Sequence, residues 1–207
     1  MLQNCALLTL AIGLCGILQA ETFYGPTTLV NKKFDTLTIH GPAILKKVKV
    51  NSLTVHGSLA FSEIEVSGKG DIYGSVEGVE GKFIDVMVKG SLNAEKIQMK
   101  SLYVQGLTVL KDFTFTSDVS ILGRLNAIKG TFQNLTAGSE EPGEVVFLED
   151  VKAHNIVLNK NIHGTLLELS RQTFVSGSIR FQWGEGTVEK GKYAQISGPI
   201  EGGALKE

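Results

Sequence analysis

Leu53-Thr-Val-His-Gly57 and Leu102-Tyr-Val-Gln-Gly106 share one pattern, in which two apolar residues alternate with other residues and a glycine follows. Alternation with period two is typical of a β-strand with one buried face, and glycine permits a backbone turn that other residues resist. The glycine recurs at intervals of 16 or 17 residues, at Gly41, Gly57, Gly74, Gly90, Gly106 and Gly123. A fixed interval of this kind indicates a solenoid, in which each repeat is one coil that buries its apolar side against its neighbours.

Two further positions of each repeat are also apolar. The ninth residue after the glycine is apolar in every repeat, and the second is apolar in all but one, where Thr108 stands. Three apolar stations per repeat predict three short strands around a narrow core. A repeat of 16–17 residues is too short for a crossover helix, so the sequence predicts an all-β fold, a single parallel β-helix whose coils lie about 4.8 Å apart. A β-sandwich of hairpins would instead contain Asn-Gly or Asp-Gly turns, and neither dipeptide occurs.

The repeats divide the chain into four parts. Residues 1–20 contain no charged side chain and end in the small residue Ala20, which is typical of a secretory signal peptide with a helical apolar stretch. We expect residues 21–36 to form an N-terminal arm or cap, residues 37–138 the regular coils, and residues 139–207 irregular coils with a C-terminal cap. An uncleaved anchor and a lipidated Cys15 are alternatives for the first part, although Leu14 is larger than the residue that usually precedes a lipidated cysteine.

Charge and cysteine content limit the function. The net charge is −1, with lysines and acidic residues mixed along the chain, so nucleic acid is not an expected partner. Both cysteines, Cys5 and Cys15, lie in the expected signal peptide, so a cleaved chain would have no disulfide. The expected location is the periplasm or the cell surface.

One stretch of the repeats resembles a known family. The run Val86-Met-Val-Lys-Gly-Ser-Leu-Asn-Ala-Glu-Lys-Ile97, followed by Leu102-Tyr-Val-Gln-Gly106, is similar to the bactofilins, bacterial polymer-forming proteins built as a β-helix. The similarity covers residues 37–132. It implies end-to-end self-association into non-polar filaments without a nucleotide, often near a membrane. The expected export signal and the differently spaced C-terminal part depart from that family.

Side chains with catalytic or metal-binding chemistry form no recognisable motif. His40 and His56 occupy equivalent positions, and a β-helix would place them about 5 Å apart on its outer surface, but the column continues through Tyr73 and Lys89 and offers no third ligand. A glycosidase would need two carboxylates roughly 5–10 Å apart in a groove, whereas charged residues between strands are more often corners that face water. The candidate carboxylates are Asp71, Glu77, Glu80 and Asp85. We expect no catalytic, metal or cofactor site, and no enzymatic activity.

The sequence therefore predicts a non-enzymatic exported scaffold that associates with further copies of itself through the ends or faces of the β-helix. Unpaired strand edges at the ends would provide the contact. The expected contact residues are Leu37, Ile39 and Gly41 at the front and Ile196, Gly198 and Ile200 at the back. The alternative is a surface adhesin or glycan-binding module that contacts the cell envelope or a glycan through exposed residues such as Lys46, Tyr73 and Lys89.

Overall fold

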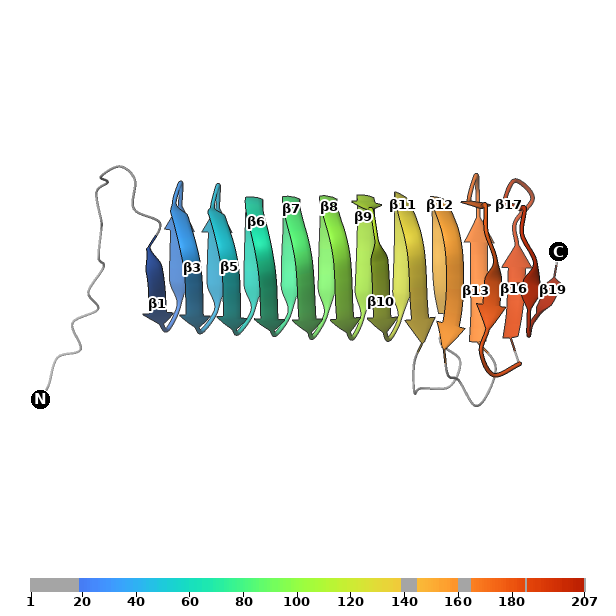
Figure 1. Cartoon of the computed structure of the whole chain (residues 1–207), viewed down its shortest axis with the longest axis horizontal. Helices are drawn as coiled ribbons and strands as arrows, with labels where there is room; N and C mark the ends of the chain where they lie inside the picture. Colours follow the sequence, from blue (N-terminus) through green and yellow to red (C-terminus); the bar gives the residue numbers. More distant parts are fainter. Residues whose placement is uncertain (1–18, 139–144, 160–164, 185, 207) are drawn as a thin grey trace, which may run out of the picture.

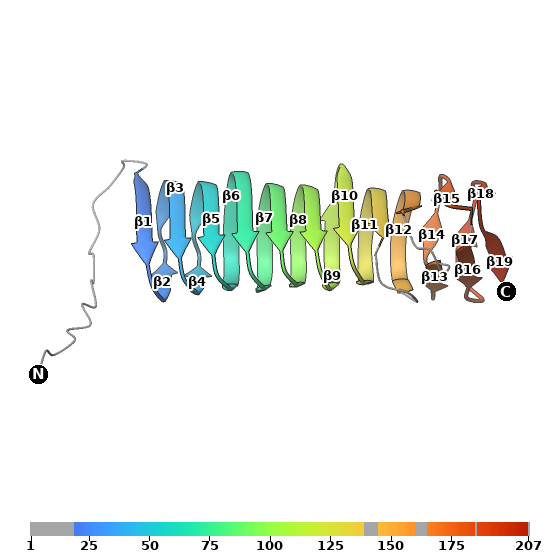
Figure 2. The same ribbon diagram turned by 90° about the horizontal axis from the view of Figure 1, so that it is seen from below.

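The computed structural model describes residues 19–138, 145–159, 165–184 and 186–206. These residues form a parallel β-solenoid of about 10 turns without a helix, seen from two sides as a straight stack in Figures 1 and 2. Every strand pairs in parallel with the equivalent strand of the next coil, so the predicted parallel β-helix is confirmed. The expected signal peptide lies outside the described residues, apart from Gln19 and Ala20.

The strands run in chain order along the rod. The strands of the regular coils are β1 (Ala20–Tyr24), β2 (Thr27–Val30), β3 (Lys33–His40), β4 (Ala43–Lys46), β5 (Lys49–His56), β6 (Leu59–Tyr73), β7 (Val76–Lys89), β8 (Leu92–Gln105), β9 (Thr108–Phe115), β10 (Asp118–Leu122) and β11 (Leu125–Gly138). The later strands are β12 (Val145–Asn159), β13 (Thr165–Ser170), β14 (Phe174–Val175), β15 (Ile179–Phe181), β16 (Gly186–Lys190), β17 (Gln195–Ile196), β18 (Ile200–Glu201) and β19 (Ala204–Lys206). Long strands such as β6 bend at the corners of the coil without ending, because the ladder to the next coil continues across them.

Like positions of successive coils stack to form the core. Leu59 lies beside Val76, and Val76 beside Leu92, so each inward position becomes a column of buried side chains. Where a column contains a glycine, a large neighbour fills the space. A Cβ atom added to Gly78 would lie 2.5 Å from the ring of Phe61 in the preceding coil.

The glycines that revealed the repeat stack on one another at a corner. Gly90 has φ +151°, a value that favours glycine, and an added Cβ there would lie 2.4 Å from the carbonyl oxygen of Gly74. Gly106 meets Gly90 in the same way. Both the backbone angle and the contact with the neighbouring coil therefore require glycine at this corner.

The stack is longer at its N-terminal end than the repeats alone suggest. β1 pairs with β3 from Ala20 beside Thr36 to Tyr24 beside His40, and β2 pairs with β4. Residues 20–36, expected to form an arm or cap, thus contain the first coil. Towards the C-terminus the interval lengthens from 16–17 to 21 residues, as in the pairing of Val145 with Leu166.

Candidate functional site

The repeating pattern of strand pairs stops at the two ends of the rod (Figure 1). At the N-terminal end β1 pairs with β3 and β2 with β4, and at the C-terminal end β17, β18 and β19 pair with β14, β15 and β16. No strand of the described residues covers the outer edges of these end strands. Their free N–H and C=O groups can therefore accept a further strand.

Apolar positions that are buried in the middle of the rod become partly exposed at both ends. Phe23 and Leu29 of the first coil, and Ile196 and Ile200 of the last, are only partly buried against the core. Ile39, which lies beside Phe23 one coil further in, is completely buried. A further coil at either end would remove apolar surface from water, which favours association.

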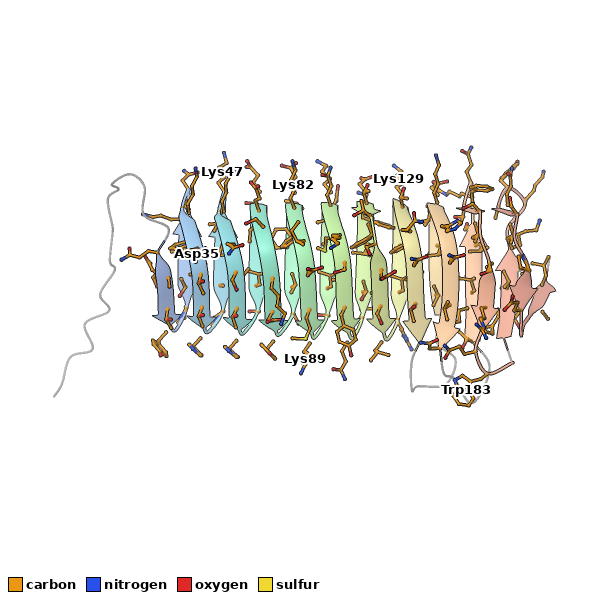
Figure 3. All side chains as sticks on the ribbon, viewed as in Figure 1. Asp35, Lys47, Lys82, Lys89, Lys129 and Trp183 are labelled. Atoms are coloured by element: carbon orange, nitrogen blue, oxygen red, sulfur yellow. The ribbon has the colours of Figure 1, made fainter. Side chains whose placement is uncertain are left out.

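The most exposed aromatic residues also lie in the first coil and the last two coils. Tyr24 is 80% exposed, Trp183 68% and Tyr193 65%, whereas no other exposed large apolar residue exceeds 51%. Trp183 projects from the same edge of the rod as Lys89, as Figure 3 shows. The concentration of exposed aromatic surface in the terminal coils again identifies the ends as candidate contact surfaces.

The structure places the two predicted contact segments differently. Leu37 and Ile39 are completely buried, and Gly41 lies against Gly25, because β1 covers them from the N-terminal side. These residues lie one coil inside the rod, and the N-terminal end is formed by β1 and β2. The sequence gave no clear repeat there, so its first coil was assigned to an arm.

The C-terminal segment does lie at the end of the stack. Ile196 belongs to β17 and Ile200 to β18, each of which pairs on one side only among the described residues. Gly198 lies between them, and an added Cβ there would be 2.1 Å from the carbonyl oxygen of Gly177 in the preceding coil.

The two histidines form part of an aromatic column on the rod surface. The rings of His40 and His56 stack with centroids 4.8 Å apart and planes inclined by 3°, as the sequence predicted, and Tyr24 and Tyr73 stack above and below them at 4.9 Å. Because nitrogen lone pairs lie in the ring planes, two parallel imidazoles cannot point both lone pairs at one metal ion. The described residues contain no group of three or more potential metal ligands among His, Cys, Asp and Glu.

The same column limits how Tyr73 could contact a sugar. One face of its ring lies against His56, and the ammonium group of Lys89 lies 5.5 Å from its centroid. A sugar that stacks on an aromatic side chain needs an open ring face. In this column only the outer face of Tyr24, at the end of the rod, has no ring of the described residues against it.

The four candidate carboxylates lie at different positions of the coil and three already have partners. Asp71 pairs with Lys69 at 2.8 Å, Glu80 pairs with Lys96 at 3.4 Å, and Asp85 accepts a hydrogen bond from Ser101. Glu77 is exposed on the middle of the rod. Glu80 occupies a corner, whereas Asp71 and Glu77 lie on two different strands, so these side chains do not form the facing pair that glycoside cleavage requires.

One corner of the coil carries a charged column that was not predicted from the sequence. Its residues adopt positive φ between 51° and 60° although they are not glycine. They are Asn31, Lys47, Glu63, Glu80, Lys96, Asp112, Lys129, Asp150 and Arg171. In the regular coils each lies six residues after a corner glycine, an interval that could have identified it.

Neighbouring members of this charged column form ion pairs between coils. Lys47 lies 3.6 Å from Glu63, and Arg171 lies 3.7 Å from Asp150. Figure 3 shows Lys47 and Lys129 at the edge opposite Lys89. Exposed pairs of this kind contribute little stability individually, and mixed signs along the edge give no concentrated charge for a polyanion.

No family model, curated protein or solved structure matches the chain. Within the described residues no helix has the length and apolar character needed to cross a membrane. The parallel solenoid fold and the geometry of its two ends are therefore the basis for a functional proposal.

Proposed function

We propose that this protein is a non-enzymatic scaffold that is exported and associates with copies of itself through the ends of its β-helix. The observation that carries the proposal is the coincidence of unpaired strand edges with partly exposed core residues at both ends, such as Phe23 and Ile200. The resemblance of residues 86–106 to the bactofilins supports the same kind of assembly.

The association joins the C-terminal end of one copy to the N-terminal end of the next. Only this orientation keeps every strand parallel across the junction and continues each column of the stack. β18 then adds to β1 and β19 adds to β2, which is strand addition to an open sheet edge. The resulting filament is polar, in contrast to the non-polar filaments that the bactofilin resemblance implies.

Export rests on the first 20 residues of the sequence, and places the scaffold in the periplasm or at the cell surface. Mass spectrometry of the native N-terminus tests this part of the proposal. A chain that begins at Glu21 supports cleavage and export. A lipidated Cys15 supports export with membrane anchoring, whereas an intact Met1 contradicts cleavage.

Disulfide cross-linking tests the end-to-end contact. Thr22 and Glu201 occupy the outward column on opposite ends of the rod, and joining the ends would place them one strand spacing apart, about 4.8 Å. That distance lies in the range that a disulfide bridges. In a full-length chain with Cys5→Ser and Cys15→Ser, the double variant Thr22→Cys, Glu201→Cys should give a ladder of covalent oligomers on oxidation.

Single variants make the cross-linking result specific. Thr22→Cys and Glu201→Cys should each stay monomeric alone and form covalent dimers when mixed. Ser120→Cys, in the same column at the middle of the rod, is the control for random collisions. Dimers of either single variant alone would refute the head-to-tail orientation, and yields no higher than those of Ser120→Cys throughout would refute end association.

A further inference from the structure

Charged residues occupy core columns only near the two ends of the described stack. Glu21 lies beside Leu37, which is completely buried, and Lys190 lies beside Leu169, also completely buried. Lys32 precedes Lys33 in the first coil as buried Val48 precedes Lys49 in the second. Every other inward position of the described coils holds an apolar residue, glycine or threonine.

Glu21 differs from the two lysines in its reach. A lysine side chain is long enough to cover apolar surface while its ammonium group stays in water. The shorter glutamate side chain points inward from β1 and alternates with Phe23, so its carboxylate lies at the core position directly outside Leu37. It is partly exposed because no coil of the described residues covers it.

A second copy added to β1 would cover this carboxylate. In the head-to-tail junction the residue placed over Glu21 is Ile200, which belongs to the same inward column. Burying an unpaired carboxylate between Ile200 and Leu37 is costly, and inward-pointing charges on edge strands are a known means of limiting edge-to-edge association. We propose that Glu21 weakens association at the N-terminal end and thereby keeps the growth of the assembly limited.

The proposal rests on end-to-end association as the protein's function, and Glu21→Val tests it. Valine suits a β-strand and matches the apolar residues that occupy this column elsewhere. Sedimentation velocity of the full-length chain over a series of concentrations should show Glu21→Val associating at a concentration at least tenfold lower than the wild type. Thermal unfolding of both proteins should confirm that the fold is retained.

Glu77→Val is the matched control, because it removes the same charge from an exposed position in the middle of the rod. It should associate as the wild type does. If Glu21→Val behaves like the wild type, or if Glu77→Val promotes association equally, the role of Glu21 is refuted.

The two proposals fail in different ways. A wild type that stays monomeric at every concentration while Glu21→Val associates would contradict self-association as the native function and support the role of Glu21. A wild type that associates as readily as Glu21→Val would support self-association and refute the role of Glu21. Absence of association in both proteins would refute both.

Discussion

Substitution of Gly90 by alanine tests the stacked glycine corner most directly. The new Cβ would lie 2.4 Å from the oxygen and 2.6 Å from the carbon of Gly74, atoms of a backbone that is itself held by the coil before it. A side chain at φ +151° adds strain of about 1–3 kcal/mol, and overpacking costs a further 1–3 kcal/mol or so. The free energy of unfolding should therefore fall by about 2–6 kcal/mol, a large fraction of the stability of a typical domain.

Urea unfolding followed by far-ultraviolet circular dichroism measures this change. Gly25→Ala is the matched control, because Gly25 has φ +86° at the open end of the same column and an added Cβ there meets nothing within 4 Å. It should lose only the strain part, about 1–3 kcal/mol. A Gly90→Ala protein within about 0.5 kcal/mol of the wild type, or no less stable than Gly25→Ala, would show that the corner glycines are not required by backbone contact.

Three further predictions concern single side chains. Thr108→Val should raise the free energy of unfolding by about 1–2 kcal/mol, seen as a higher melting temperature in calorimetry, because the completely buried Thr108 hydroxyl has no hydrogen-bond partner; a lower melting temperature would contradict this. Lys129→Gly should stabilise the protein by about 0.5–1 kcal/mol by relieving its positive φ, whereas Lys82→Gly in an extended strand should destabilise it by a similar amount; equal effects in urea unfolding would refute the corner assignment. The Lys49 ammonium, through its hydrogen bond and its charge, lowers the pKa of Glu65 below the ordinary value of 4.5, so this pair stabilises the fold above that pH and ceases to do so as the pH falls through the lowered pKa. Lys49→Met should move the pKa of Glu65 upward in an NMR titration, and an unchanged value would exclude the pairing.

The columns of the core could be predicted because each one repeats in the sequence. Leu53 and Val55 before a glycine, and Val66 nine residues after it, have counterparts in every regular coil, and all three are buried. A period of two within a segment and of 16–17 residues between segments specifies both the inward face and the stacking partner. The spacing of the two stacked histidine rings followed from the same register.

The ends of the rod could not be predicted in this way. Residues 20–30 lack the glycine interval in a form that stands out, because Glu21 replaces an apolar residue in the pattern and the first coil has no neighbour before it among the described residues. The expected front contact was therefore placed at Leu37, one coil too far inward. The charged corner column escaped notice because residues such as Lys96 are common on protein surfaces, and their positive φ is visible only in the backbone.

The sequence by itself determined that the chain winds into a stack of parallel coils, because the periodic alternation of apolar residues and glycine satisfies burial and backbone geometry in that arrangement. Only the tertiary structure decided where the stack begins and ends. An inward glutamate is an interruption when read along the chain, whereas its place on the outermost strand makes it the first residue that an added copy would cover. That distinction depends on which backbone edges remain unpaired, and pairing between coils is a property of the folded chain.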